Sequence, residues 1–188
     1  MRIILTIWAA ALMLALFQVP AWAGGFEQGT AHYRRGHYAE ALDILQPLAR
    51  KGDPYAQFAL AVMYDDGKGV PQSHSLALKW YLCAARNGLA DAQYAAAMYY
   101  ASGRGIKPNV RKSYFWFNLA TAGGYPRGTR ARDQQDGELS RSEVAKTQAD
   151  SVDWLSKHPR QLSCKTRRCI HPAWYPKPRW NKLTLYGW

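Results

Sequence analysis

The chain matches itself when it is shifted by 36 residues, and the match needs no gap. Under this shift Trp80 aligns with Trp116, and the glycines at 67 and 69 align with those at 103 and 105. Other aligned pairs are Ala56 with Ala92, Gln57 with Gln93, Tyr64 with Tyr100, Val70 with Ile106, Tyr81 with Phe117, Ala84 with Ala120 and Gly88 with Gly124. A period of roughly 20–50 residues indicates consecutive copies of one supersecondary unit, which bury their apolar faces against each other.

Each unit predicts two helices joined by a turn. Residues 54–66 of the first unit are rich in alanine, a small residue that lets a neighbouring helix approach closely. Ser73 can cap a second helix, whose apolar residues recur at helical spacing until Gly88 ends it. The second unit repeats this plan over residues 90–102 and 109–123.

Glycines are expected to form the turn inside each unit. Glycine readily takes the positive φ that is needed just past the end of a helix. Phosphate-binding loops are also rich in glycine, but the recurrence of this loop at the same place in both units favours a turn. The predicted structural turns are Gly67, Gly69, Gly103 and Gly105.

The two units resemble the Sel1-like repeat family, which is related to the tetratricopeptide repeats. In the first unit the resemblance rests on Leu60-Ala61-Val62-Met63-Tyr64, on Gly67-Lys68-Gly69-Val70, and on Trp80-Tyr81 followed by Ala84-Ala85. The second unit departs more, with Ala96-Ala97 at a Leu-Gly position and Ser113 in place of an alanine. The resemblance covers residues 54–124. It implies an all-α fold, a short α-solenoid of antiparallel helix pairs, and a protein that binds another protein.

The segments on either side extend the helical prediction, with the two repeats assigned to residues 53–124. Residues 24–52 are similar to a tetratricopeptide helix pair. Downstream, Ser140 and Glu143 form a capping box that should open a helix reaching about residue 157. With a further helix over 127–137, this segment (125–158) would cap the last repeat. Residues 159–188 contain four prolines, which argue against a helix and favour an extended tail.

The N-terminal 23 residues have the pattern of a secretory signal peptide. Arg2 precedes an almost wholly apolar run, and Ala21-Trp22-Ala23 supplies the small-x-small pattern that signal peptidase reads. We expect cleavage after Ala23 and a periplasmic or secreted protein. The alternative is an uncleaved membrane anchor, since the apolar run is near the lower length limit for spanning a bilayer.

Positive charge predicts an attraction to acidic partners. The chain has 25 Lys plus Arg against 13 Asp plus Glu. Nucleic acid is not expected as the partner, because it is scarce outside the cytoplasm; an acidic protein, an anionic envelope polymer or lipid remain as partners. The predicted tail (159–188) carries seven basic and no acidic residues, so a tail-driven binder of anionic polymer or lipid is the alternative function.

Export also makes disulfide bonds possible. Cys164 and Cys169 are close in sequence, and we favour a disulfide between them over a metal site, because the spacing is not Cys-x-x-Cys. Cys83 aligns with Leu119 of the second unit, so a buried and inert thiol is the expected state of Cys83.

Catalytic and metal-binding motifs were considered and no enzyme is predicted. The sequence has no His-Glu-x-x-His, no Ser-x-x-Lys and no Gly-x-Ser-x-Gly. His74 and His171 stand alone, and no carboxylate at ligand spacing supports a metal site at His32 and His37. No cofactor or metal is expected. An enzyme acting on the cell wall is the least favoured function.

The resemblance to tetratricopeptide proteins indicates which side chains line the concave face. On the first helix of each unit these are positions i, i+3, i+7 and i+10. An apolar row with an occasional carboxylate suits a peptide or helical ligand, as in a scaffold or regulator of the bacterial envelope; the alternative is that a short structure buries the same row. The predicted partner-binding residues are Phe26, Tyr33, Tyr55, Phe58, Val62, Asp65, Asp91, Tyr94 and Met98.

Overall fold

The computed structural model of the chain describes residues 24–158. The predicted signal peptide (1–23), the extended tail (159–188) and the Cys164–Cys169 disulfide lie outside the described residues. The division of the chain into those segments therefore stays a prediction.

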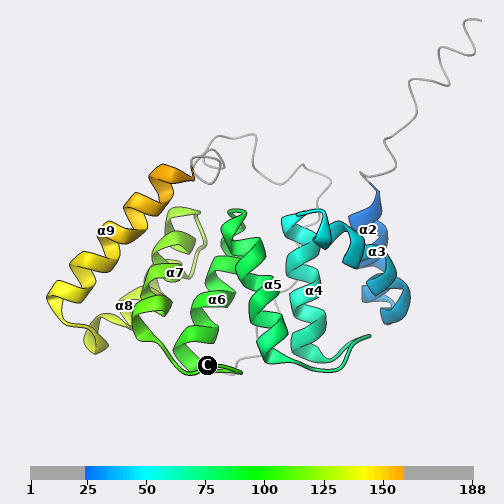
Figure 1. Cartoon of the computed structure of the whole chain (residues 1–188), viewed down its shortest axis with the longest axis horizontal. Helices are drawn as coiled ribbons and strands as arrows, with labels where there is room; N and C mark the ends of the chain where they lie inside the picture. The colour runs from blue at the N-terminus through cyan, green and yellow to red at the C-terminus, as the bar shows by residue number, and fades with distance from the viewer. Residues whose placement is uncertain (1–23, 159–188) are drawn as a thin grey trace, which may run out of the picture. The chain divides into compact units, whose positions relative to one another are not determined.

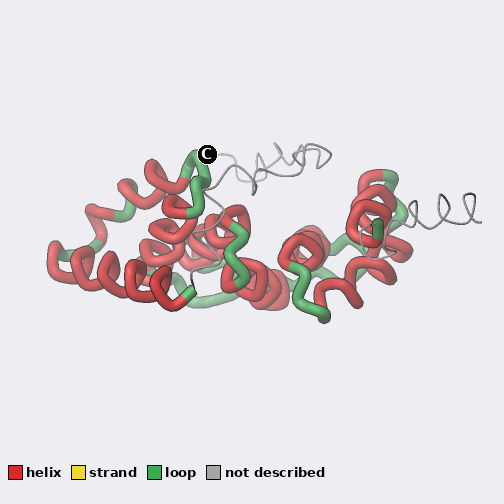
Figure 2. Tube along the Cα trace, turned by 90° about the horizontal axis from the view of Figure 1, so that it is seen from above, coloured by secondary structure: helices red, strands yellow, loops and turns green. Residues whose placement is uncertain are grey.

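The described residues form helices joined by short loops, without any strand (Figures 1 and 2). This confirms the predicted all-α class. In order, the elements are α2 (Gly25–Arg34), α3 (Tyr38–Arg50), α4 (Pro54–Asp66), α5 (His74–Arg86), α6 (Ala90–Ser102), α7 (Val110–Ala122), α8 (Gly128–Asp133), the 3₁₀ turn η1 (Asp136–Glu138) and α9 (Arg141–Lys157). None of the helices within residues 24–158 has both the length and the apolar character required to cross a membrane.

The chain divides into two compact units, the first ending at Trp80 and the second beginning at Tyr81, so that the boundary falls within the sequence of α5. In the first unit α3 packs against both α2 and α4. In the second unit α7 packs against α6, α8 and α9. Neighbouring helices therefore pack in pairs, as the repeat predicts.

Local signals in the sequence explain where the helices begin and end. The Asp53 carboxylate accepts a hydrogen bond from the backbone N–H of Ala56 at 2.7 Å, and Pro54 occupies the first turn, where a missing N–H costs nothing. α4 ends at Gly67, whose φ is +70°, and α6 ends at Gly103, whose φ is +72°. The bounds of α4 and α6 are those predicted from the repeat.

A buried glutamine holds each repeat to the helix before it. In the first unit the Gln57 side-chain amide donates to the carbonyl of Ala49 at 3.1 Å, and in the second unit Gln93 donates to the carbonyl of Ala85 at the same distance. The two glutamines are only 6% and 2% exposed. A polar group that is buried this deeply needs a partner, and the last turn of a helix offers unused carbonyls. In both repeats, therefore, the glutamine of the recurring Ala-Gln pair links the first helix to the last turn of the preceding helix.

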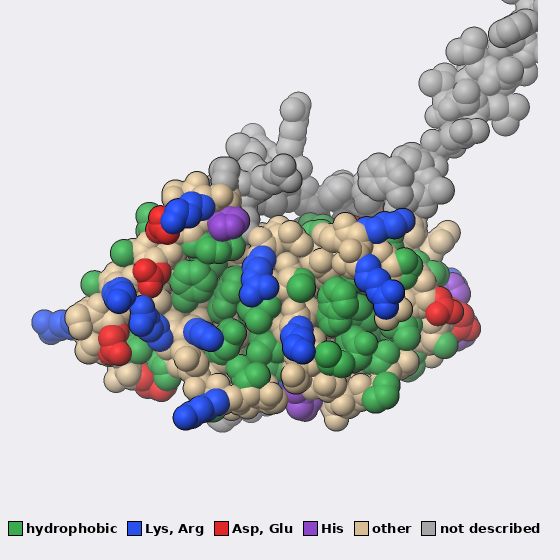
Figure 3. All heavy atoms as spheres, in the orientation of Figure 1, with side chains coloured by type: hydrophobic (Ala, Val, Ile, Leu, Met, Phe, Trp, Pro, Cys, Tyr) green, Lys and Arg blue, Asp and Glu red, His purple; other side chains and the backbone are tan. Residues whose placement is uncertain are grey.

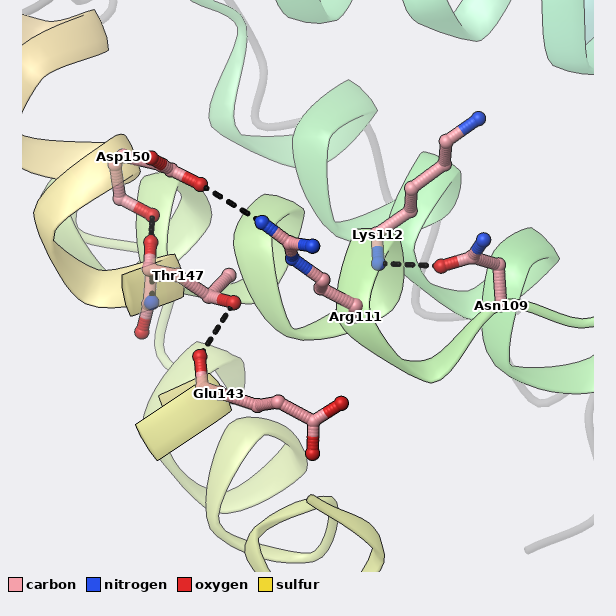
Figure 4. Close-up of polar contacts among 8 residues, drawn as sticks. Asn109, Arg111, Lys112, Glu143, Thr147 and Asp150 are labelled. Atoms are coloured by element: carbon pink, nitrogen blue, oxygen red, sulfur yellow. Dashed lines mark hydrogen bonds and ion pairs between the residues drawn. The ribbon is translucent and has the colours of Figure 1, made fainter. Parts of the chain in front are cut away.

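The predicted C-terminal helix exists and begins with the predicted capping box. The Ser140 hydroxyl accepts from the backbone N–H of Glu143, and the Glu143 carboxylate accepts from the backbone N–H of Ser140 at 2.9 Å. α9 contacts α7 through the ring of Trp154, which lies 6.4 Å from that of Phe115, and through polar groups. Thr147 is buried and donates to the Glu143 carbonyl at 2.8 Å, and Arg111 on α7 reaches the carboxylate of Asp150 at 3.4 Å (Figure 4).

The predicted helix over 127–137 is instead the short helix α8 followed by the turn η1. α8 lies where the 36-residue period would place the first helix of a further unit. Gly128 and Ala131 stand 36 residues after Ala92 and Ala95, and all four are buried. The glycine permits a close approach, because a Cβ at Gly128 would lie 2.9 Å from the backbone nitrogen of Thr121. α8 is only six residues long, whereas α4 and α6 each have 13.

The second helices of the two repeats differ in burial at aligned positions. Trp116 is 7% exposed, whereas Trp80 is half-buried. Leu119 is buried, but Cys83, which aligns with it, is half-buried and free. The prediction of a buried Cys83 is therefore wrong. Alignment preserves a position along the helix, while burial depends on what packs against it.

Candidate functional site

The first helix of each repeat leaves one row of side chains partly exposed. In α4 the half-buried residues Tyr55, Phe58 and Val62 recur at the spacing predicted for a binding face. The residues between them are buried, including Ala56, Gln57, Ala59, Leu60 and Ala61. The row is therefore a consequence of helical periodicity, since one face of α4 packs inside the unit and the opposite edge remains partly open.

In the first unit this row includes a residue from α2. The rings of Phe26 and Tyr55 lie 5.9 Å apart, centre to centre, which is the range of a favourable aromatic pair. We call Phe26, Tyr55, Phe58 and Val62 the first row. All four side chains are half-buried.

Tyr33 does not belong to the first row, although it was predicted there. It is 8% exposed, and its hydroxyl donates to the Asp66 carboxylate at 3.2 Å. The Lys68 ammonium donates to the same carboxylate at 2.9 Å and lies 5.5 Å from the centre of the Tyr33 ring. Burial and the Asp66 charge raise the pKa of Tyr33 to about 12. Tyr33 therefore ties α2 to the end of α4.

Asp65 is also placed inside the first unit. The side chain is buried, and its Oδ1 lies 3.0 Å from Nδ1 of His74 at the start of α5. A buried carboxylate with such a partner holds two helices together and is not presented to a ligand. Tyr33 and Asp65 are thus corrections to the predicted surface, because helical spacing cannot tell which side chains a neighbouring helix covers.

In the second unit the row centres on a pair of tyrosines. Tyr94 on α6 stacks on Tyr125, with ring centres 4.4 Å apart and planes tilted by 26°, and its ring also lies 5.4 Å from that of Phe117. Burial raises the pKa of Tyr94. Burial, followed by the charge of Asp91, raises the pKa of Tyr125 to about 12.

We call Tyr94, Met98 and Tyr125 the second row. All three side chains are half-buried, and Asp91 beside them is exposed. The sequence-based selection missed Tyr125, which lies after α7 and not on a first helix. The 36-residue repeat could have pointed to Tyr125. Tyr125 aligns with Leu89, which occupies the N-cap position of α6 and is also half-buried.

Exposed apolar side chains also occur outside the two rows. Figure 3 shows hydrophobic side chains between lysine and arginine side chains on the face that it draws. Leu76 is 37% exposed and Val152 is 67% exposed, and neither belongs to a row. Single exposed apolar residues are normal on protein surfaces. The two rows differ from these because several aromatic side chains lie together in them.

The chemistry available to the rows is binding through apolar and aromatic contact. No three His, Cys, Asp or Glu side chains gather as metal ligands in the part of the chain that the structure describes. Tyrosine and phenylalanine provide large contact areas with few rotatable bonds, which suits them to protein interfaces.

The repeats match a known family. The Sel1 repeat family matches residues 54–89 and 90–125. No curated protein sequence matches the chain. Sel1 repeats generally mediate protein–protein interactions, and proteins built from them are generally not catalytic.

Solved structures show the same fold. A Sel1 repeat protein from Oxalobacter formigenes is 28% identical with a TM-score of 0.55, and the match covers 60% of this chain and 87% of that chain. A protective antigen present in uropathogenic Escherichia coli strains, which displays an SLR fold, is 24% identical with a TM-score of 0.69 over 75% of this chain. This chain spans only 31% of the antigen's length. The likeness confirms the predicted solenoid class of helix pairs, and the family match places two consecutive Sel1 repeats at residues 54–125 of the chain.

Proposed function

We propose that the chain is an exported scaffold or regulator of the bacterial envelope, which binds a partner protein through the first and second rows. The observation that carries the proposal is the row itself. An aromatic side chain recurs at one register of the first helices, as Phe58 and Tyr94, and an aliphatic one recurs four residues later, as Val62 and Met98. All four are half-buried, while the positions between them are buried. Contiguous exposed apolar side chains on a protein surface often mark an interaction site.

The rows are tested by placing a charge in each. Val62→Lys with Met98→Lys puts an ammonium group on both rows, where a partner's apolar surface would have to desolvate it. We expect recovery of the partner by crosslinking in the native envelope to fall at least about tenfold, which corresponds to roughly 1.4 kcal/mol. The matched control is Leu76→Lys with Val152→Lys, which adds the same charge to apolar positions outside the rows. Equal recovery with both double variants would show that the rows are not the binding surface.

Binding by the basic tail is the second candidate function. It is favoured by the seven basic and no acidic residues of the segment 159–188, which also has three tryptophans. Deletion of this segment should leave partner recovery largely intact if the rows bind, with a lower association rate through the lost positive charge. If the tail binds, recovery disappears with the deletion, and the row variant behaves as the wild type.

Export is a separate part of the proposal. Cleavage after Ala23 should yield a mature N-terminus at Gly24. N-terminal sequencing of protein from the envelope fraction measures this directly. Envelope protein that still begins at Met1 would replace the exported form by an anchored one.

A further inference from the structure

The second row has a basic residue beside its aromatic pair. Arg127 follows Tyr125 by two residues, immediately before α8, and its side chain is exposed. The backbone N–H of Gly128 donates to the carbonyl of Tyr125 at 3.0 Å, so Arg127 lies in the turn that directly follows the stacked tyrosine. The charge of Arg127 also opposes the effect of burial on the pKa of both Tyr94 and Tyr125. A cation that is exposed beside half-buried aromatic rings can reach a ligand that lies across those rings.

The charge of Arg127 is not neutralised within the fold. Arg127 makes no ion pair with any side chain that the structure describes, whereas Arg132 of the same segment pairs with Asp133 at 2.7 Å. Residues 125–132 carry three arginines and no acidic residue. The carboxylate of Asp91 is the acidic group near Tyr125, and it raises the pKa of that tyrosine. Because Arg132 is paired with Asp133, Arg127 and Arg130 remain against Asp91, so the segment beside the second row carries a net positive charge.

An apolar row beside an uncompensated guanidinium is complementary to one kind of ligand. An aromatic or aliphatic side chain would stack on the tyrosine pair and cover Met98. A carboxylate a few residues away would reach Arg127, where the planar guanidinium can donate two parallel hydrogen bonds. A ligand with a lysine at that place would meet a like charge.

We propose that the second row together with Arg127 binds a peptide segment of the partner in which a carboxylate side chain lies next to an aromatic or aliphatic one. This inference rests on the proposed function, since it names the chemistry of the partner that the second row would receive. The specificity comes from Arg127, and the apolar contact comes from the tyrosine pair.

The test uses the exported form of the protein and a display library of random twelve-residue peptides. Panning on the wild type should enrich peptides that combine Asp or Glu with an aromatic or aliphatic residue. A capped synthetic peptide from the enriched set is then titrated against variants. Arg127→Glu should weaken its binding about tenfold at low salt, and Arg127→Gln about threefold. Arg141→Glu, an exposed arginine on α9 with the same change in net charge, should weaken it less than twofold.

The outcomes separate this inference from the proposed function. In one outcome the enriched peptides have no acidic residues, and they lose affinity with Val62→Lys and Met98→Lys but not with Arg127→Glu. This result would overturn the acidic specificity and leave the rows as the binding surface. Enriched peptides that are insensitive to both changes, or no enrichment at all, would overturn both. Equal losses with Arg127→Glu and Arg141→Glu would show a general charge effect, which also overturns the proposal.

Discussion

Trp116→Ala is expected to lower the free energy of unfolding by about 3–5 kcal/mol, which is the usual cost of truncating a buried tryptophan. The Trp116 ring is 7% exposed, lies 5.3 Å from the ring of Phe115 and 6.2 Å from that of Trp154 on α9, and packs edge-on against both. Alanine would leave a cavity between α7 and α9 and would remove one of the two α7 rings that contact Trp154. Urea denaturation measures the loss, and amide hydrogen exchange should show that α9 becomes less protected than α6.

Trp80→Ala is the matched control for this prediction. Trp80 occupies the same position in the first repeat, but it is half-buried, so its truncation should cost roughly half as much. The comparison separates burial from repeat register. If the two substitutions cost the same, the register alone determines the contribution of this tryptophan, and the covering of Trp116 by α9 contributes nothing.

Gly69→Val is expected to cost at least about 2 kcal/mol, because two effects act together. Gly69 has a φ of +75°, a conformation that β-branched residues strongly disfavour. A Cβ would also lie 2.8 Å from the carbonyl oxygen of Tyr38 and 3.1 Å from the Cε of Met63. The backbone oxygen cannot move without displacing the start of α3. Gly105→Val, at a φ of +68°, should also destabilise the second unit.

Gly36→Val isolates the first of these effects. Gly36 has a φ of +83° but no atom within 4 Å of an added Cβ, so it keeps the backbone strain and removes the steric overlap. We expect a cost of about 1 kcal/mol there. Thermal melting of both variants measures the difference. If the Gly36→Val and Gly69→Val variants have the same melting temperature, the steric contact with Tyr38 does not contribute to the loss of stability.

The helices were predictable because their signals are local. The 36-residue period, the Ser140 capping box and the glycines after α4 and α6 all act within a few residues of the feature they specify. The role of the buried glutamines was not predictable in this way. Gln57 and Gln93 recur in register, but only the structure shows that each bonds to a carbonyl of the preceding helix.

The candidate site was predictable only in part. Helical spacing selected Tyr55, Phe58 and Tyr94, and these are half-buried in the structure. The same spacing selected Tyr33 and Asp65, which are bound to Asp66 and His74 inside the first unit. Spacing gives the direction in which a side chain leaves its own helix. It contains no information about what another helix places in front of that side chain.

The amino-acid sequence by itself therefore determined the repeat, the order and bounds of most helices, and the turns at Gly67 and Gly103. These depend on backbone preferences and hydrogen bonds between residues close in the chain. Tertiary packing alone decided that Trp116 is buried while Trp80 is half-buried, and that Tyr125 stacks on Tyr94. Those outcomes depend on contacts between residues far apart in the sequence, where burial is set by the surface that each helix meets.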